Sequence, residues 1–456
     1  MSQPKLWKHQ EYTYEKFSRT RIGYDMSDPG TGKTLTHLYI YNQRPSAGRC
    51  LVLCPKTLMQ SAWGSDIERF FPHLTYSIAD ARNRLAAFAV DTDIVIMNLD
   101  GVRDLAKLKP RELAQLLSEF DHLIIDEVTG YKHPVSQRSK MAVKLSPHFD
   151  WRFGLSGTPC PISVTELHTP MMIIDRGERL GRSWTRWRNA VQVARQVGPM
   201  ANHVRWEDRP DAHDVAMHLL RDVTVRHTFE EVMRDVPENH VDMKYFPLSN
   251  KLRKMYDELE RTSILQLEQH DITAVHAAQV RNKLLQLCSG AVYYGPNEYE
   301  VVDPFRYELI TELVLEREHS LTFFNWKHQR DLLSEYFDRA GISFAVLDGD
   351  TKDRERADIV KAYQDGKYRT LLMHPRTGAH GLTLTRGTTA IVSSPIYEAD
   401  VLKQIKHRVY RGGQTQATNL LLVCARGTVE EPVYDKLNSR SQKMGDFLEL
   451  IKEYKK

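Results

Sequence analysis

Short runs of apolar residues recur in two clusters along the chain, and each run ends at polar residues or at Pro and Gly. Uninterrupted apolar runs of this length are typical of strands that are buried on both faces of a parallel sheet. The predicted strands are Cys50–Cys54, Asp93–Met97, His122–Ile125 and Arg152–Leu155 in the first cluster, and Leu321–Phe324, Phe344–Leu347, Thr370–Met373, Ala390–Val392 and Leu420–Val423 in the second.

The segments between these runs have helical character. They predict helices over Asp66–Phe71, Leu105–Phe120, Asp331–Ala340 and Arg354–Gln364. Buried strands that alternate with helices predict an α/β fold, here with two parallel sheets. Ligand sites in such sheets lie at the carboxyl ends of the strands, so the residues that follow each strand are the candidates for chemistry.

Strand signals become sparse between residues 160 and 320, where Leu248–His270 and Thr273–Leu287 are predicted to be helices. At 456 residues the chain is long enough for two to three domains. We expect one domain over residues 1–235, with a helical protrusion rich in Arg and Trp at about 165–225. A second domain is expected over 236–456, with a helical protrusion at about 248–290.

Composition adds only general limits. The net charge of +4 is too small to identify a partner, and no apolar run approaches the roughly 20 residues that span a bilayer. The N-terminal residues lack the apolar core of a signal peptide. The five cysteines form no C-x-x-C pair, so we expect neither a zinc site nor a disulfide framework. Apolar neighbours such as those of Cys54 predict buried free thiols, which fits a cytosolic protein.

The stretch Asp28–Thr34 ends in G-K-T and should open a helix. Its glycines allow backbone N–H groups to approach phosphate oxygens, Lys33 adds a point charge, and the Thr34 hydroxyl can ligate Mg²⁺. Ser27 stands where the strict phosphate-loop pattern has Gly, and a chance loop is the alternative interpretation. The candidate nucleotide-binding residues here are Asp28, Pro29, Gly30, Thr31, Gly32, Lys33 and Thr34.

Two further predicted strands end in candidate chemistry. His122–Ile125 is followed by Asp126, which would hold Mg²⁺ through water, and by Glu127, which would orient or deprotonate the attacking water. Solvated acids at a strand end are the alternative. The strand ending at Leu155 leads into Ser156, Gly157 and Thr158, a turn that is expected to couple the nucleotide state to the second domain.

Near the other end, Gln404–Gln414 has the form Q-x-x-x-R-x-x-R-x-G-Q. On a helix these spacings place Gln404, Arg408 and Arg411 on one face. Two fixed guanidinium groups need an anion to face, and phosphate suits their fork geometry. A solvated basic helix is the alternative. Together with the phosphate loop far upstream, the pair predicts a nucleotide held between two domains.

Between Arg179 and Trp206 there are six arginines and neither Asp nor Glu, with Trp184, Trp187 and Trp206 interleaved. One interpretation is a solvated basic face with its tryptophans packed inward. The other is a protrusion that contacts phosphates and offers an aromatic ring for stacking at a fork. The candidate DNA-binding residues of this segment are Arg182, Trp184, Arg186 and Arg188.

The order of these motifs resembles the superfamily 2 helicase-type ATPases, and most of all their Swi/Snf branch. The matching stretches are Leu6–Gln10, Asp28–Thr34, Leu51–Lys56 with Trp63, Asp126–Pro134, Leu155–Pro159, Val225–Val232 with Val236-Pro237, Leu285–Cys288, Leu347–Thr351, Arg376–Leu384 and Gln404–Gln414. The resemblance covers nearly the whole chain. It departs from the branch at Thr129, where His is usual, and at Ser27.

The resemblance implies two RecA-like lobes with helical protrusions, which clasp ATP and Mg²⁺. The catalytic residues it implies are Lys33, Asp126, Glu127, Arg408 and Arg411. It adds Gln10, Gly381 and Gln404 to the ATP-binding residues, assigns Thr34 and Asp126 to Mg²⁺, and assigns Lys56, Thr57 and Thr377 to DNA.

The resulting hypothesis is a DNA-dependent ATPase that translocates on duplex or branched DNA and remodels junctions or protein–DNA complexes, in recombination or replication. A helicase that separates strands is the first alternative. A non-hydrolysing scaffold and an unrelated phosphate-loop enzyme such as a kinase are less consistent with the intact catalytic residues and the motif order. We expect a monomer in the cytoplasm of a bacterium or a virus-infected cell, rather than the nucleus, with mostly backbone contacts to DNA and no membrane contact.

Overall fold

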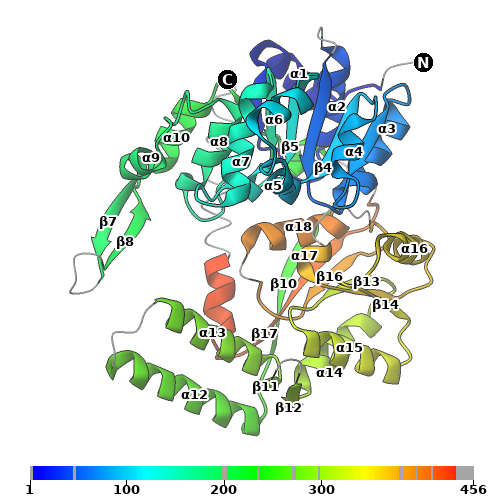
Figure 1. Ribbon diagram of the computed structural model, residues 1–456. Coiled ribbons are helices and arrows are strands. Elements are labelled where there is room, and N and C mark those ends of the chain that lie inside the picture. The colour runs from blue at the N-terminus through cyan, green and yellow to red at the C-terminus, as the bar shows by residue number, and fades with distance from the viewer. Residues whose placement is uncertain are drawn as a thin grey trace. The chain divides into compact units, whose positions relative to one another are not determined.

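The computed structural model describes residues 4–44, 48–197, 203–233, 236–269, 274–295, 298–378, 384–396, 398–411 and 414–437. These residues form two compact units, one within 4–233 and one within 236–437 (Figure 1). Each unit is built around its own parallel sheet. The two-sheet α/β fold predicted from the sequence is therefore confirmed, and each unit is described by itself below.

The sheet of the first unit has seven parallel strands. Their spatial order is β3 (Tyr76–Ala79), β4 (Ile94–Asn98), β2 (Arg49–Cys54), β5 (Phe120–Asp126), β6 (Trp151–Leu155), β1 (Ile22–Asp25) and β9 (Thr224–Val225). The helices of this unit are α1 (Lys8–Thr20), α2 (Lys33–Gln43), α3 (Ser65–Phe70), α4 (Arg84–Ala89), α5 (Val102–Leu105), α6 (Pro110–Leu116), α7 (Gln137–Leu145), α8 (His168–Ile174), α9 (Trp184–Val191), α10 (Ala212–Leu220) and α11 (Phe229–Val232).

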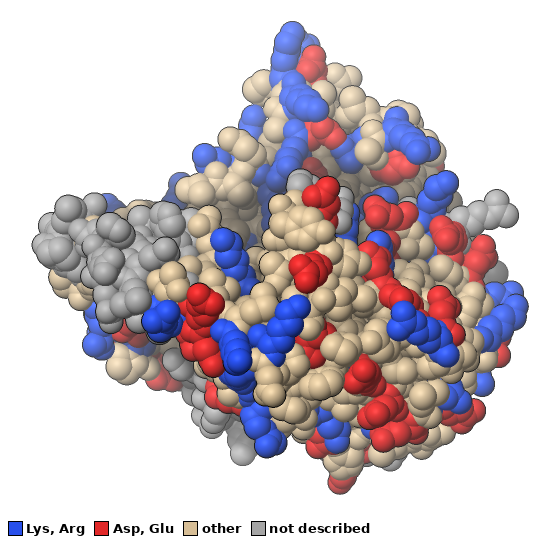
Figure 2. Space-filling view, turned by 90° about the horizontal axis from the view of Figure 1, so that it is seen from below, with Lys and Arg blue, Asp and Glu red and all other residues tan. Residues whose placement is uncertain are grey.

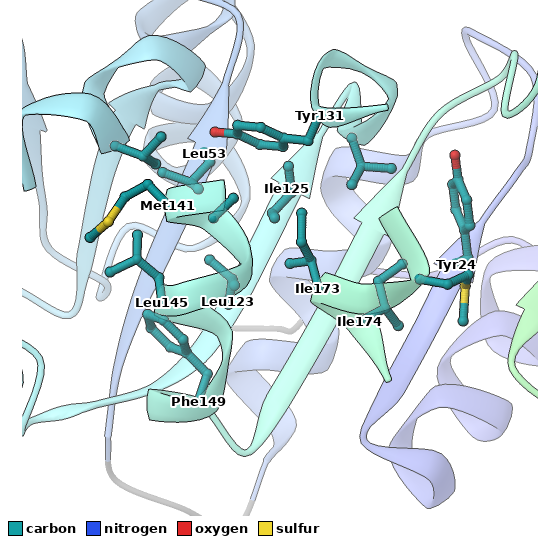
Figure 3. Packing of buried hydrophobic residues seen from close by; sticks show 14 of the residues in the cluster. Tyr24, Leu53, Leu123, Ile125, Tyr131, Met141, Leu145, Phe149, Ile173 and Ile174 are labelled. Carbon is teal, nitrogen blue, oxygen red and sulfur yellow. The ribbon is translucent and has the colours of Figure 1, made fainter. Parts of the chain in front are cut away.

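Alternate residues of the central strands belong to two different hydrophobic clusters. In β2, Leu51 and Leu53 belong to one cluster, while Cys50, Val52 and Cys54 belong to the other. Because successive side chains of a strand point to opposite faces, the sheet is buried on both sides, which explains why its strands are continuous apolar runs. Figure 3 shows the first cluster, where Leu53, Leu123 and Ile125 meet side chains such as Met141, Leu145 and Ile173.

The sheet of the second unit has six parallel strands. Their order is β10 (Asn239–Phe246), β17 (Thr418–Ala425), β16 (Thr389–Val392), β13 (Ser320–Phe323), β15 (Thr370–Met373) and β14 (Phe344–Leu347). The helices are α12 (Asn250–Gln269), α13 (Ala274–Cys288), α14 (Phe305–Leu315), α15 (Lys327–Arg339), α16 (Asp353–Gln364), α17 (Pro375–Gly378) and α18 (Ala399–Val409), and a small hairpin joins β11 (Ala291–Gly295) to β12 (Glu298–Val301).

The helical pair α12–α13 is fastened to the second sheet by a buried arginine. Arg306 is 1% exposed and pairs with Glu430 at 2.6 Å. It also donates to the carbonyl of Cys288 at the end of α13, and to the carbonyl of Ser393 just beyond β16. A buried guanidinium needs such partners, because leaving it unpaired away from water is costly.

Two predictions about the helices were wrong. The helix expected over Leu105–Phe120 is divided into α5 and α6, since Pro110 takes the first position of α6, and Phe120 already belongs to β5. The protrusion expected at about 165–225 is not wholly helical. After α9 it continues into an antiparallel hairpin of β7 (Gln192–Gln196) and β8 (Val204–Asp208), which extends away from the sheet of the first unit (Figure 1).

Candidate nucleotide site

The predicted motifs of the first unit lie along one edge of its sheet. All seven strands are parallel, so their carboxyl ends meet at the same edge. The phosphate loop follows β1, Asp126 ends β5, and Ser156 follows β6. These three strands are immediate neighbours in the order β5-β6-β1. The fold therefore brings distant parts of the sequence together. The ends of β1 and β6 pair at Asp25 and Leu155, which are 130 positions apart.

The phosphate loop depends on its glycines. Gly30 and Gly32 have φ angles of +83° and +80°, a conformation that residues with a Cβ adopt at a cost. Gly32 caps the N-terminus of α2, where free backbone N–H groups favour an anion. The Lys33 ammonium donates to the carbonyls of Ser27 and Asp28, at 2.7 and 2.9 Å. Its charge is thus held at the loop where phosphate oxygens would bind.

A buried ion pair fastens this loop to the end of the sheet. The Asp28 carboxylate pairs with Arg226 at 2.6 Å, and both side chains are 5% exposed. The second oxygen of Asp28 accepts from the backbone N–H of Phe229 at 3.0 Å. The Ser27 hydroxyl accepts from the backbone N–H of His227 at 3.1 Å, so the departure from Gly at position 27 supplies a contact. In the sequence Arg226 was visible only as part of a family stretch, without this role.

Helix α1 also contacts the loop. Gln10, which is 2% exposed, donates its amide to the carbonyl of Gly32 at 3.2 Å and accepts from the backbone N–H of Trp7 at 2.9 Å. His9 Nε2 lies 2.8 Å from the carbonyl of Thr31. A Cβ on Gly32 would lie only 2.5 Å from the Gln10 amide nitrogen, which is a second reason for glycine at that position.

Beneath the loop lies a buried pair that the sequence did not predict. Asp25, the last residue of β1, accepts from the backbone N–H of Ser27 at 3.0 Å and lies 3.3 Å from His37 Nε2. Burial by itself raises the pKa of Asp25, but His37, Lys33 and Ser27 outweigh burial and lower it below its usual value. Asp25 is therefore ionised and adds a negative charge beneath the loop. This pair left little sign in the sequence. Asp25 and His37 are polar residues that stand beside apolar ones in β1 and α2.

Asp126 is held in a fixed orientation by two donors. Its Oδ2 accepts from the indole N–H of Trp63 at 3.1 Å, and its Oδ1 accepts from the backbone N–H of Glu127 at 3.1 Å. Burial raises the pKa of Asp126, while the charge of Lys33 opposes that rise. Carboxylate and hydroxyl oxygens are the ligands that Mg²⁺ prefers, so Asp126 and Thr34 fit the ion that the sequence implies.

Glu127 adopts a strained backbone conformation. Its φ of 54° and ψ of 52° lie in the left-handed region, which a non-glycine residue enters at a cost of about 1–3 kcal/mol. The Ser156 hydroxyl donates to its carboxylate at 3.3 Å, and Thr129 Oγ1 lies 3.4 Å from the same hydroxyl. Thr129, the departure from His, is thus part of a short chain of hydroxyl groups that leads to Glu127.

The turn after β6 contacts both sides of this site. Thr158 donates its backbone N–H to the Ser156 hydroxyl at 3.2 Å. Gly157 packs on the phosphate loop so closely that an added Cβ would lie 2.8 Å from Pro29 Cδ. Of the three residues predicted to couple the nucleotide state to the second domain, Ser156 therefore contacts Glu127 and Gly157 contacts the phosphate loop, both within the first unit.

The predicted site residues of the second unit are distributed differently from the expectation. Gln404 and Arg408 lie at buried positions on α18, but this helix ends at Val409 and the backbone leaves the helical conformation at Tyr410. Arg411 lies beyond that end, so the expectation of one helical face for all three residues was wrong. The two glycines that follow Arg411 in the sequence also disfavour a longer helix. Gly381 lies outside the described residues, and Thr377 lies on α17.

The arginines of the protrusion fall into two classes. Arg179 pairs with Asp175 and Asp222, and Arg195 and Arg205 both pair with Glu207. The other three form no ion pair with any residue that the structure describes; they are Arg182, Arg186 and Arg188.

Its tryptophans are divided in a similar way. Trp187 is buried and donates to the carbonyl of Val164 at 3.3 Å. Trp184 and Trp206 are partly exposed, and the Arg188 guanidinium lies over both rings, 5.2 and 3.7 Å from their centroids. Both interpretations of this segment therefore hold in part, because some of its residues pack inward and others form an exposed surface. The exposed set, called the α9 surface below, consists of Arg182, Trp184, Arg186, Arg188 and Trp206.

Comparison with known proteins assigns the family. The SNF2-related domain matches residues 24–289, more than half of the chain, and the helicase conserved C-terminal domain matches residues 306–413. The chain belongs to the SNF2-related family. It is therefore a helicase-type ATPase, as the motif order predicted.

Its relatives range from short to long proteins. The chain is 26% identical to putative protein p41 of Acyrthosiphon pisum secondary endosymbiont phage 1, over 95% of both chains. It is 23% identical to the transcription regulatory protein SNF2 of Saccharomyces cerevisiae and to the putative ATP-dependent helicase/translocase YwqA of Bacillus subtilis. Of these two longer proteins it spans only 25% and 45%.

A solved structure of the Sulfolobus solfataricus SWI2/SNF2 ATPase core in complex with dsDNA is 19% identical, over 97% of this chain and 93% of that chain, with a TM-score of 0.44.

Among the described residues of this chain, no helix is long and apolar enough to cross a bilayer. All five cysteines are free and buried, as predicted.

Proposed function

We propose that this SNF2-related ATPase uses ATP hydrolysis to translocate on duplex or branched DNA, and so remodels DNA junctions or protein–DNA complexes. The observation that carries the proposal is the convergence of Lys33, Asp126, Glu127 and Ser156 at one sheet edge. That edge contains a cation for phosphate, oxygen ligands for a metal, and a carboxylate for water, which are the groups that phosphoryl transfer to water requires.

Each of these residues has a defined task in hydrolysis. Lys33 and the backbone N–H groups at the start of α2 bind the β- and γ-phosphates of ATP. Thr34 and Asp126 would hold Mg²⁺, which would neutralise charge on the phosphate oxygens. Glu127 orients the attacking water and accepts its proton, while Ser156 holds the Glu127 carboxylate in place. Gln10, already at the phosphate loop, is assigned to the adenine base, as the resemblance implies.

Arg408 and Arg411 of the second unit complete the proposed catalytic set. Guanidinium groups stabilise the charge that develops on the transferred phosphate, and a group supplied in this way contributes a factor of about 10³–10⁵ in rate. Gln404 is assigned to the same nucleotide. Because these groups belong to a unit separate from the phosphate loop, hydrolysis can be tied to relative movement of the two units.

The α9 surface is the proposed DNA-contacting surface outside the motifs that resemble the family. Its three arginines have no carboxylate partner in the described chain, so phosphates can supply the counter-charge. Figure 2 shows the face of the molecule that is seen from below, where Lys and Arg are interspersed with Asp and Glu. Charge alone therefore does not identify a DNA path there. Lys56 and Thr57 after β2, and Thr377 on α17, are the other proposed contacts, all to the DNA backbone rather than the bases.

The relatives support a bacterial or phage setting for this proposed motor. The match over nearly the full length of a phage protein favours a motor of bacterial or phage type acting in the cytoplasm. YwqA, another relative, is described as a putative ATP-dependent helicase/translocase.

The decisive experiment is a steady-state ATPase assay with single-stranded, duplex, forked and four-way DNA. We expect duplex and branched DNA to raise the turnover number above that with single strands. Stimulation by single strands alone would favour the strand-separating helicase, and a rate unaffected by any DNA would contradict the proposal. A strand-displacement assay on the forked substrate then separates translocation from unwinding.

A further inference from the structure

One continuous segment connects an exposed basic residue to the interior of the nucleotide site. It begins where β2 ends and runs from Pro55 to Gly64. Lys56 is exposed, whereas Trp63, seven residues later, is fully buried. Residues Met59–Gly64 form a π-helix, a rare conformation that is frequent at functional sites. The segment is thus short and leads from an exposed lysine to a buried indole, with Gln60 and Ser61 between them also exposed.

Hydrogen bonds within the segment 55–64 hold its conformation. The backbone N–H groups of Leu58 and Met59 donate to the carbonyls of Pro55 and Lys56, at 2.8 and 3.4 Å. The Ser61 hydroxyl donates to the carbonyl of Thr57. A displacement of its exposed end would therefore be transmitted along the segment rather than absorbed by a loose loop.

The buried end of the segment is fixed on Asp126. Trp63 belongs to the hydrophobic cluster on one face of the sheet, with Cys54, Ile67 and Phe71, so packing fixes the plane of its indole ring. The indole N–H then donates to Asp126 Oδ2 at 3.1 Å. Donors to the ligands of a metal orient those ligands, and their removal typically weakens metal binding by about 10–100-fold.

We propose that Trp63 is a positioning residue that aims the Asp126 carboxylate at the Mg²⁺–ATP complex, and that the segment 55–64 ties this orientation to a DNA phosphate bound at Lys56 and Thr57. The part of the proposal that concerns Mg²⁺ stands on the geometry of Trp63 and Asp126. The part that concerns DNA rests on the proposed function. DNA would then stimulate hydrolysis because its binding fixes the segment that holds the metal ligand.

Trp63→Phe tests the first part, because it removes the N–H donor and keeps an aromatic ring. The readout is the Mg²⁺ concentration for half-maximal binding of a fluorescent non-hydrolysable ATP analogue, measured by anisotropy. We expect this concentration to rise about 10-fold or more. The matched control is Trp187→Phe, which also removes an indole N–H from a buried hydrogen bond, but on the carbonyl of Val164. An unchanged Mg²⁺ requirement in folded Trp63→Phe would overturn the positioning role.

A second variant guards against loss of packing, since Phe is smaller than Trp. Replacement of Trp63 by benzothienylalanine puts sulfur in place of the N–H at nearly constant volume. If the Mg²⁺ requirement rises in this variant as it does in Trp63→Phe, the hydrogen bond is responsible. If it stays at the wild-type value, the effect of Phe comes from packing and the proposal fails.

The second part is tested by ATPase rates at saturating Mg²⁺, with and without duplex DNA. We expect Trp63→Phe to lose most of the stimulation while its affinity for duplex, measured separately, stays within about twofold of wild type. Full stimulation in the variant would refute the link to DNA. If wild-type protein is not stimulated by any DNA, the proposed function and this link both fail, and the Mg²⁺ titration still decides the role of Trp63.

Discussion

The first unit uses the same two residue types, arginine and tryptophan, in opposite ways in two regions. At the phosphate-loop edge, Arg226 is buried in an ion pair with Asp28, and Trp63 is fully buried with its N–H on Asp126. On the α9 surface, Arg188 lies over Trp184 and Trp206, and Arg182 and Arg186 are exposed.

The difference shows how environment assigns a task to a side chain. A buried charge must be paired, because desolvation without a partner is costly, so the buried Arg226 acts as a structural partner of Asp28. An exposed arginine without an internal partner keeps its donors available to phosphate. We therefore expect substitutions at the loop edge to change stability and turnover, and substitutions on the α9 surface to change DNA affinity.

The largest expected effect comes from the catalytic groups of the loop edge. Glu127→Gln should lower kcat by about 10²–10⁴, because water activation is lost while the site keeps its shape. Binding of ATP, measured by anisotropy, should remain. Lys33→Ala should abolish turnover, because it removes the charge at the β- and γ-phosphates. Substantial hydrolysis by Glu127→Gln would refute the assignment of this residue.

Substitution of Arg408 and Arg411 tests whether the residues at the phosphate-loop edge of the first sheet are sufficient for full ATP hydrolysis. Arg408→Ala and Arg411→Ala should each lower kcat by about 10³ with little change in ATP affinity, if each stabilises the transferred phosphate. Arg339→Ala, an exposed arginine of α15 that pairs with Glu335, is the matched control and should keep the wild-type rate. Wild-type turnover in both of the first two variants would mean that this segment is only a basic helix.

The third prediction sharpens the contrast between buried and exposed arginines. Arg226→Ala should lower the free energy of unfolding by about 3–5 kcal/mol, because it removes the guanidinium that compensates the buried charge of Asp28. Arg182→Ala should change it by no more than about 0.5 kcal/mol. Chemical denaturation followed by tryptophan fluorescence measures both. Similar values for the two variants would remove the distinction between the regions.

The fourth prediction concerns the α9 surface. Changing Arg182, Arg186 and Arg188 together to Ala should weaken duplex binding for every sequence tested. The slope of log affinity against log salt should become shallower by about 0.9 for each DNA phosphate that the variant no longer neutralises. ATPase activity without DNA should persist. If affinity and slope match those of wild type in the folded triple variant, the DNA path lies elsewhere on the protein.

The smallest effect is expected from pH, at the base of the protrusion. His168 is 3% exposed and its Nε2 lies 3.0 Å from the carbonyl of Gly181, next to Arg182. Burial lowers the pKa of His168, although the Gly181 carbonyl opposes the shift. The unfolded chain therefore takes up a proton that the folded protein does not, and stability present above the ordinary histidine pKa of about 6.5 is lost as pH falls below it.

The variant His168→Gln isolates this contribution, because its amide can still donate to the Gly181 carbonyl but cannot be protonated. The loss of thermal stability between pH 7.5 and pH 5.5 should be smaller in His168→Gln than in wild type. Identical pH dependence in the two proteins would show that His168 does not contribute.

The fold was predictable where apolar runs were continuous. The strands β2, β5, β14 and β15 follow their predicted ranges to within two residues, because strands buried on both faces leave a strong signal. The strands that were missed had weaker patterns. β1 includes Gly23 and ends at Asp25, and the hairpin strands β7 and β8 have mostly partly buried or exposed side chains.

The sequence by itself determined the two sheets, the phosphate loop with Lys33, and the acids Asp126 and Glu127, because each is a local pattern with its own spacing. Only the tertiary structure decided which distant residues meet. Arg226 reaches Asp28 across 198 positions, and Trp63 reaches Asp126 across 63, because parallel strands bring their carboxyl ends to one edge whatever their separation in the chain. The same packing decided which arginines of the protrusion are paired, since an acid such as Asp222 lies outside any local pattern.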